Sequence, residues 1–306
     1  MRDAVAAIDC GTNSIRLLIW GQDGEVTRQM RIVRLGEGVD STGRFTEAAL
    51  RRTREALADY VAMMREAGVA RTRMVATSAT RDAANREDFF RMTEDLLGQR
   101  AEVISGVEEA SLSFHGAIAD LDDTAGPFCV IDLGGGSTEF IVGDRSGIRG
   151  AHSAQMGCVR LTERILHSVP PTYAEVAQAR EYVRDRLQEV LNDVPLGQTH
   201  TLVGVAGTFT TICALAQGLS EYDATRIHGT ELDFGEVRAV TQRLNSQTPE
   251  ERRQSPVMHP GRADVIGGGS VVVEEILRCL GNEAGVDTLR ISEHDILDGI
   301  VQGLLA

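Results

Sequence analysis

The chain has 306 residues, enough for two domains of ordinary size, and its 42% hydrophobic and 25% charged residues are typical of a folded globular protein. Its net charge is −14, and all 31 basic residues are arginine. The acidity disfavours a nucleic-acid partner, and the lack of lysine excludes a Walker-type phosphate lysine and Schiff-base chemistry. No apolar run approaches the ~20 residues of a membrane span. Asp3 and Asp9 lie too early in the chain for a secretory signal peptide. We therefore expect a cytoplasmic protein with no membrane partner.

The five cysteines are odd in number and form no CxxC motif. Most of them stand within apolar runs, so we expect buried, reduced thiols rather than disulfides. They are Cys10, Cys129, Cys158, Cys213 and Cys279.

The first predicted elements are two antiparallel strands joined by a tight glycine turn at residues 8–14, IDCGTNS. The same pattern returns 123 positions later at residues 131–137, IDLGGGS, again between two apolar runs. One such match could arise by chance. It becomes significant only if the following segments repeat as well.

The likeness continues along the chain. The residues QM and VRL of the segment 29–35 recur in order at 155–161. A helix then begins after Thr46 in the first copy and after Thr172 in the second, where Thr172 and Glu175 have the spacing of a capping box. A further strand ends in small residues at 74–80 and at 202–208. The sequence therefore predicts an α/β protein made of two duplicated domains that face one another across a cleft.

Each copy of the repeat places an aspartate at a strand end beside a glycine turn. Such a turn lets a backbone approach an anion and aims N–H groups at it, while the carboxylate can hold Mg²⁺. For a single turn, a plain hairpin is the simpler interpretation. The facing pair, with a third turn at 206–208, favours a site for a chain of phosphates.

The sequence resembles the exopolyphosphatase and guanosine pentaphosphatase (Ppx/GppA) family over nearly its whole length. That family has the actin, Hsp70 and sugar-kinase fold, built from two ribonuclease-H-like domains. The motifs that carry the resemblance are DCGTNSIRL at 9–17, ATSATRDAAN at 76–85, ISGVEEASLSF at 104–114, DLGGGSTEF at 132–140, MGCVRLTE at 156–163, GVAGT at 204–208 and RISEHDILDGI at 290–300.

The resemblance implies a first lobe over residues 1–118, joined by a C-terminal helix at about 294–306, and a second lobe over residues 119–293. The chain stops at Ala306, just after that helix. It therefore resembles the short two-domain form, without the HD-type C-terminal extension of long members, which puts processive action on long polymers in doubt.

The resemblance also implies that Glu109 is the catalytic base that activates water. The residues support this choice over Glu108, because Ser105 and Glu108 have capping-box spacing and Glu108 would then serve the helix start. Glu109 lies about 100° further around the helix. Without the resemblance, Glu109 would be interpreted as an exposed glutamate that favours the helix dipole.

By the same resemblance Asp9 and Asp132 hold a divalent cation such as Mg²⁺, with Glu139 as a further candidate whose alternative is a strand residue facing solvent. Arg81 is implied to contact the phosphates, the alternative being a pair with Asp82 or Glu87. The implied phosphate-binding residues are Thr12, Asn13, Ser14, Arg81, Gly134, Gly135, Gly136, Ser137, Gly207 and Thr208.

Two other features resemble functional sites but are interpreted as structural. The run GGGS at 267–270 precedes an apolar helix and is interpreted as a site of close helix packing. His294 and Asp295 suggest an HD metal site, but a single HD is weak, and the remaining histidines lack ligand spacing, so zinc is not expected.

The implied activity is release of orthophosphate from the end of inorganic polyphosphate, which is the expected partner. Hydrolysis of guanosine pentaphosphate and a non-catalytic sensor for alarmones or nucleotides remain alternatives, so guanosine penta- and tetraphosphate are candidate partners too. An aromatic content of 4%, with Trp20 as the one tryptophan, leans slightly toward polyphosphate. A homodimer stays open, and nothing in the chain resembles the sugar site of a kinase.

Overall fold

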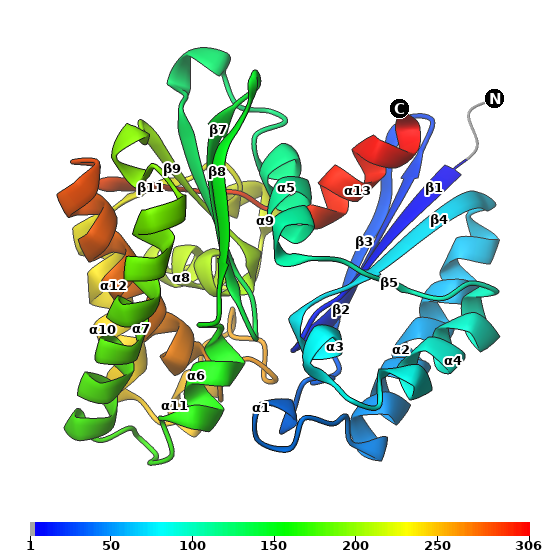
Figure 1. Ribbon diagram of the computed structural model, residues 1–306, viewed down its shortest axis with the longest axis horizontal. Coiled ribbons are helices and arrows are strands. Elements are labelled where there is room, and N and C mark those ends of the chain that lie inside the picture. The colour runs from blue at the N-terminus through cyan, green and yellow to red at the C-terminus, as the bar shows by residue number, and fades with distance from the viewer. Residues whose placement is uncertain (1–3) are drawn as a thin grey trace. The chain divides into compact units, whose positions relative to one another are not determined.

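The computed structural model describes residues 4–306. Internal contacts divide the chain into two compact units, each built on one sheet (Figure 1). Unit 1 runs to Gly116 and resumes at Ile296–Ala306, and unit 2 is the continuous stretch Ala117–Asp295. The chain therefore passes from one unit to the other twice.

The sheet of unit 1 has five strands in the order β3-β2-β1-β4-β5. The first three strands are antiparallel neighbours, whereas β4 lies parallel to β1 and β5 parallel to β4. The strands are β1 (Ala4–Cys10), β2 (Ser14–Gly21), β3 (Gly24–Ile32), β4 (Val69–Ala76) and β5 (Glu102–Val103).

The sheet of unit 2 has the order β10-β11-β9-β6-β7-β8. Read from its other edge, β8-β7-β6-β9-β11 repeats the order and directions of the first sheet, and β10 is an added antiparallel edge strand. This confirms the predicted α/β duplication. The strands are β6 (Phe128–Leu133), β7 (Thr138–Asp144), β8 (Gly147–Ala154), β9 (Thr201–Val205), β10 (Glu231–Asp233) and β11 (Thr288–Ile291).

Helices cover both faces of the first sheet (Figure 1). Side chains alternate along β1. Ala6 and Ile8 therefore join the core under α2 (Glu47–Glu66) and α4 (Arg86–Leu97), while Val5 and Ala7 join the core under α13 (Ile296–Leu305). The helices are α1 (Val39–Thr42), α2 (Glu47–Glu66), α3 (Ser78–Asp82), α4 (Arg86–Leu97), α5 (Gly106–Ala117) and α13 (Ile296–Leu305).

In unit 2, α12 packs against α6, α7 and α10. The glycine run at the start of α12 makes this possible, because a Cβ on Gly268 would lie 2.7 Å from the carbonyl oxygen of Cys158 in α6. The helices are α6 (Cys158–Arg164), α7 (Tyr173–Asp193), α8 (Ala206–Ala216), α9 (Ala224–Ile227), α10 (Phe234–Ser246), α11 (Pro249–Arg253) and α12 (Ile266–Glu283), with short 3₁₀ helices at Asp123–Ala125 and Leu196–Gln198.

The predicted helix starts are confirmed. The Thr46 hydroxyl accepts the Ala49 N–H at the start of α2, and Thr172 and Glu175 form a full capping box on α7. All five cysteines are buried and unpaired, as expected. None of the helices in the described part of the chain has the length and apolar character needed to cross a membrane.

Candidate functional site

The turn of unit 1 directs its carbonyl groups inward. The N–H of Gly11 donates to the Ser14 carbonyl at 2.9 Å, and the carbonyls of Thr12 and Asn13 accept N–H groups from the segment after β3 at 2.8–3.0 Å. Within residues 4–306, the N–H groups of Thr12 and Asn13 donate no hydrogen bond. The Thr12 hydroxyl contacts that of Ser78 at 2.9 Å, which ties the turn to the start of α3.

The turn of unit 2 is built in the same way. The N–H of Gly134 donates to the Ser137 carbonyl at 3.0 Å, and the carbonyls of Gly135 and Gly136 accept N–H groups of the segment after β8 at 2.9–3.2 Å. In the described chain the N–H groups of Gly135 and Gly136 are again not used as donors. Adjacent N–H groups left available on a turn form a nest that binds anions.

Close packing holds this second turn in place. A Cβ on Gly157, which precedes α6, would lie 2.2 Å from the carbonyl oxygen of Gly135, so only glycine fits there. The guanidinium of Arg160 also donates through Nε to the Gly136 carbonyl at 2.7 Å. The turn is therefore rigidly supported by the start of α6.

Buried carboxylates stand at corresponding places in both sheets. Asp9 faces Arg16 across the β1–β2 pair and accepts two N–H groups from it on Oδ2, at 2.6 and 3.0 Å. Asp132 faces Glu139 across the β6–β7 pair, and both are buried. The alternative in which Glu139 points to solvent is wrong, because its exposure is 0% and its Oε1 accepts the Ser153 hydroxyl at 2.7 Å.

These carboxylates fit a hard divalent cation. Two carboxylates on directly facing strand residues repel one another, and a cation between or beside them offsets that repulsion. Carboxylate oxygens are the ligands that Mg²⁺ and Ca²⁺ prefer. The donor set of Asp132 and Glu139 therefore suits such an ion.

Glu109 lies in the first turn of α5, buried to 8% exposure. Arg81, at the end of α3, donates through Nη1 to Glu109 Oε2 and to the Ile104 carbonyl, each at 2.9 Å. Its other terminal nitrogen, Nη2, is buried and has no hydrogen-bond partner among residues 4–306. A buried cationic donor without an acceptor is costly, and an anionic ligand would satisfy it.

The neighbouring glutamate behaves differently. The N–H of Glu108 donates to the Ser105 hydroxyl at 3.2 Å, but the Glu108 carboxylate pairs with Arg73 at 2.6 Å on the surface. Half of the predicted capping box forms. Glu108 thus has a structural role at the start of α5, while Glu109 is buried beside Arg81.

The third turn begins α8. Ala206 has a φ of +70°, and a Cβ on Gly207 would lie 2.2 Å from the guanidinium of Arg262. Arg262 donates to the Thr211 hydroxyl at 2.8 Å. Burial raises the pKa of the Cys158 thiol to about 11, while nearby Arg262 and Thr208 oppose that rise. The third turn therefore lies close to the start of α6.

Arg160 and Arg262 are the charged neighbours of these turns that the sequence reasoning did not assign. Arg160 stands within a repeated motif, so its position could have suggested a contact with the turn. Arg262 stands in a loop without a recognisable motif, and only the fold brings it to Gly207.

The chain matches the model of the Ppx/GppA phosphatase family over residues 22–303. A protein of Mycobacterium tuberculosis named exopolyphosphatase 2 is 53% identical, with 98% of each chain covered. A crystal structure of an exopolyphosphatase-like protein is 44% identical with a TM-score of 0.95, covering 98% of both chains. The Ppx/GppA family member of Aquifex aeolicus is 30% identical with a TM-score of 0.81, covering 99% of this chain and 97% of that one.

Both relatives with solved structures have the same overall fold as this chain, with TM-scores of 0.95 and 0.81. The match extends through both units, so it does not depend on one shared motif. The chain therefore belongs to the Ppx/GppA phosphatase family.

Proposed function

We propose that this protein is an exopolyphosphatase, which hydrolyses the terminal phosphoanhydride bond of inorganic polyphosphate and releases orthophosphate. The observation that carries the proposal is that the two corresponding turns each offer N–H groups that no described residue accepts. Phosphate groups carry anionic oxygens, which are acceptors that such N–H groups can bind. The 53% identity to exopolyphosphatase 2 supports the same substrate.

In the proposed reaction, Glu109 accepts a proton from a water molecule as that water attacks the terminal phosphorus. The bond from phosphorus to the bridging oxygen breaks, and the shortened polyphosphate leaves with the bridging oxygen. Arg81, through its unsatisfied Nη2, and the turn N–H groups of Thr12, Asn13, Gly135 and Gly136 stabilise the negative charge on the phosphate oxygens.

The reaction depends, in this proposal, on a divalent cation, with Mg²⁺ as the first choice. Asp132 and Glu139 would hold it in unit 2, and Asp9 is a further carboxylate for the same purpose. The cation neutralises phosphate charge. The ion pair between Asp9 and Arg16 keeps that aspartate in place at the end of β1.

Gly207 and Thr208 are proposed to bind phosphate as well, with Arg262 supplying positive charge beside them. Ser14, Gly134 and Ser137 shape the two main turns through their own backbone hydrogen bonds. Their contribution is to fix where the N–H groups of the central turn residues point.

The direct test measures phosphate release from polyphosphates of several lengths and from guanosine pentaphosphate, in parallel, with Mg²⁺ and with a chelator. The proposal predicts cation-dependent release from polyphosphate. Release from guanosine pentaphosphate alone would replace it with the nucleotide activity. Binding of either compound without any release would favour a sensor.

A further inference from the structure

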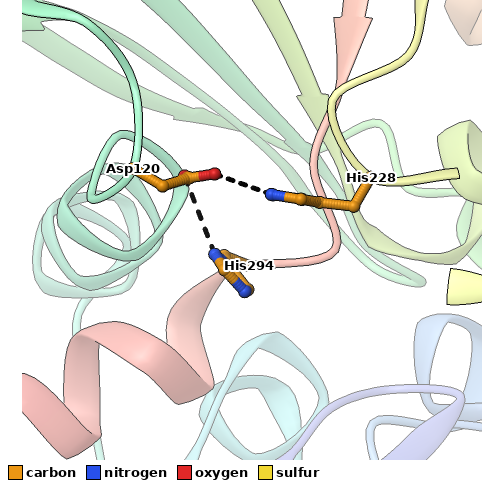
Figure 2. A group of neighbouring side chains, drawn as sticks. All are labelled: Asp120, His228 and His294. Carbon is orange, nitrogen blue, oxygen red and sulfur yellow. Dashed lines mark hydrogen bonds and ion pairs between the residues drawn. The ribbon is translucent and has the colours of Figure 1, made fainter. Parts of the chain in front are cut away.

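Two histidines and an aspartate meet in unit 2 (Figure 2). Asp120 follows α5, His228 directly follows α9, and His294 stands between β11 and α13. His228 Nε2 lies 2.7 Å from Asp120 Oδ2, and His294 Nδ1 lies 3.7 Å from Asp120 Oδ1. The two imidazole rings are also neighbours, with centroids 4.4 Å apart.

These separations are close to those of ligands that share one metal ion. Two ligand atoms at ~2.1 Å from a tetrahedral ion lie about 3.4 Å apart. With one atom from each residue, the three candidate ligand atoms lie within 4.8 Å of one another. The three side chains are therefore close enough for one ion to contact all of them after side-chain rotation.

The cluster is also reachable from solvent. The side chains of Asp120, His228 and His294 are 41%, 25% and 38% exposed, respectively. An ion can enter without any part of the core opening, and water can complete its coordination. Two imidazoles with one carboxylate favour Zn²⁺ and similar transition metals, whereas Mg²⁺ prefers an all-oxygen site.

The hydrogen bonds of His228 determine which ring nitrogen carries the proton, and therefore what must change when a metal ion binds. Its Nδ1 accepts the backbone N–H of Glu293 at 3.2 Å, so in the metal-free protein the neutral ring carries its proton on Nε2 and donates it to Asp120. A metal ion would take the place of that Nε2 proton. The proton would move through solvent to Nδ1, and the contact with the Glu293 N–H would be lost.

We propose that Asp120, His228 and His294 form a Zn²⁺-binding site that is separate from the cation site of the phosphatase reaction. The proposal reverses the sequence-based expectation that zinc is not used, because the three ligands come from segments far apart in the chain. Asp120 and His294 lie next to the two places where the chain passes between its units. Bound Zn²⁺ would therefore link the segments that contain Asp120 and His294 to the loop after α9.

The site is tested by titrating the metal-free protein with Zn²⁺ in excess Mg²⁺, against a chromophoric zinc chelator. We expect one equivalent of Zn²⁺ to bind to the wild type. His228→Ala and His294→Ala should each weaken binding at least about tenfold. His152→Ala is the matched control and should bind as the wild type does. His152 pairs with Asp193, but within residues 4–306 it belongs to no cluster of three potential ligands.

Nitrogen NMR of the imidazole rings provides a second readout. Zn²⁺ should move the His228 proton from Nε2 to Nδ1, and amide exchange at Glu293 should become faster. Asp120→Asn is a milder variant should an alanine variant fold poorly, and circular dichroism of each metal-free variant checks the fold. Glu109→Gln should bind Zn²⁺ normally, so failure of the phosphatase proposal would leave this result unaffected.

Absence of stoichiometric binding would overturn the proposal. So would Zn²⁺ affinities for folded His228→Ala and His294→Ala variants that equal the wild-type value.

Discussion

The two units have the same strand–turn–strand arrangement but differ at one equivalent position. Both place an aspartate at the end of the central strand beside a turn with available N–H groups. Across the strand pair, however, Asp9 faces Arg16 in unit 1, whereas Asp132 faces Glu139 in unit 2. Unit 1 thus neutralises its aspartate with its own side chain, and unit 2 gathers two carboxylates.

We propose that the two duplicated units have different roles in the reaction. In this proposal the turns of both copies bind phosphate. Unit 2 carries the carboxylate pair that we propose holds a divalent cation, and unit 1 carries the pair of Glu109 and Arg81 on α5 and α3. Substitutions at matched positions can test this division.

The largest effect is expected for the carboxylates of unit 2. The double variant Asp132→Asn, Glu139→Gln should lower phosphate release about 100-fold, with the Mg²⁺ requirement displaced to higher concentration. Activity measured across a Mg²⁺ titration checks this. Arg16→Gln changes the matching position of unit 1, where it only loosens Asp9, and should displace the Mg²⁺ requirement less. An equal displacement in that variant would erase the proposed difference between the units.

Arg81→Gln should lower kcat/KM for polyphosphate about 10- to 100-fold, because a charge-assisted hydrogen bond is worth ~1.5–3 kcal/mol. Steady-state kinetics with Arg81→Lys alongside separates charge from the geometry of the guanidinium. Arg100→Gln, which breaks an exposed pair with Glu87, serves as the control. Unchanged kinetics for Arg81→Gln would remove this residue from the site.

Substitutions in α13, the C-terminal helix of unit 1, should have a smaller effect, and this effect is on stability. A Cβ on Gly299 would lie 2.1 Å from the carbonyl oxygen of Leu112 in α5, whereas a Cβ on Gly303 of the same helix meets nothing within 4 Å. Gly299→Ala should lower the free energy of unfolding by about 1–3 kcal/mol, and Gly303→Ala should raise it slightly. Denaturant unfolding of both variants decides, and an equal effect would contradict the close packing of α13 on α5.

The smallest effect concerns the helix starts. Glu175 completes a capping box on α7, while the same position of α2 is Ala49. The N–H of Thr172 and other donors hold the pKa of Glu175 at about 2, below its usual 4.5, so its stabilising contribution is present above pH 4.5 and is lost as the pH falls toward 2. Glu175→Ala should therefore lower the melting temperature near neutral pH and converge with wild type in acid.

Glu181→Ala, an exposed glutamate on the same helix, is the control for that comparison. If both variants showed the same pH dependence, the capping box would not be its source.

Much of the fold could be predicted because the signals are local. Glycine turns, caps and the repeat order are encoded in neighbouring residues, so the duplication is visible in the sequence. The orientation of Glu139 could not be predicted, because β7 is buried on both faces and shows no alternation of polar and apolar residues. The cluster of Asp120, His228 and His294 was also hidden, since only tertiary structure joins its three segments.

The most direct test of the central claim compares binding and turnover in Glu109→Gln. The variant keeps the shape of the side chain but removes the base, so it should bind polyphosphate within a few-fold of wild type and release phosphate at least about 100-fold more slowly. Glu108→Gln, whose surface pair with Arg73 is remote from the reaction in this account, should remain active. Retention of more than about a hundredth of wild-type turnover by Glu109→Gln would contradict the role of Glu109 as the base.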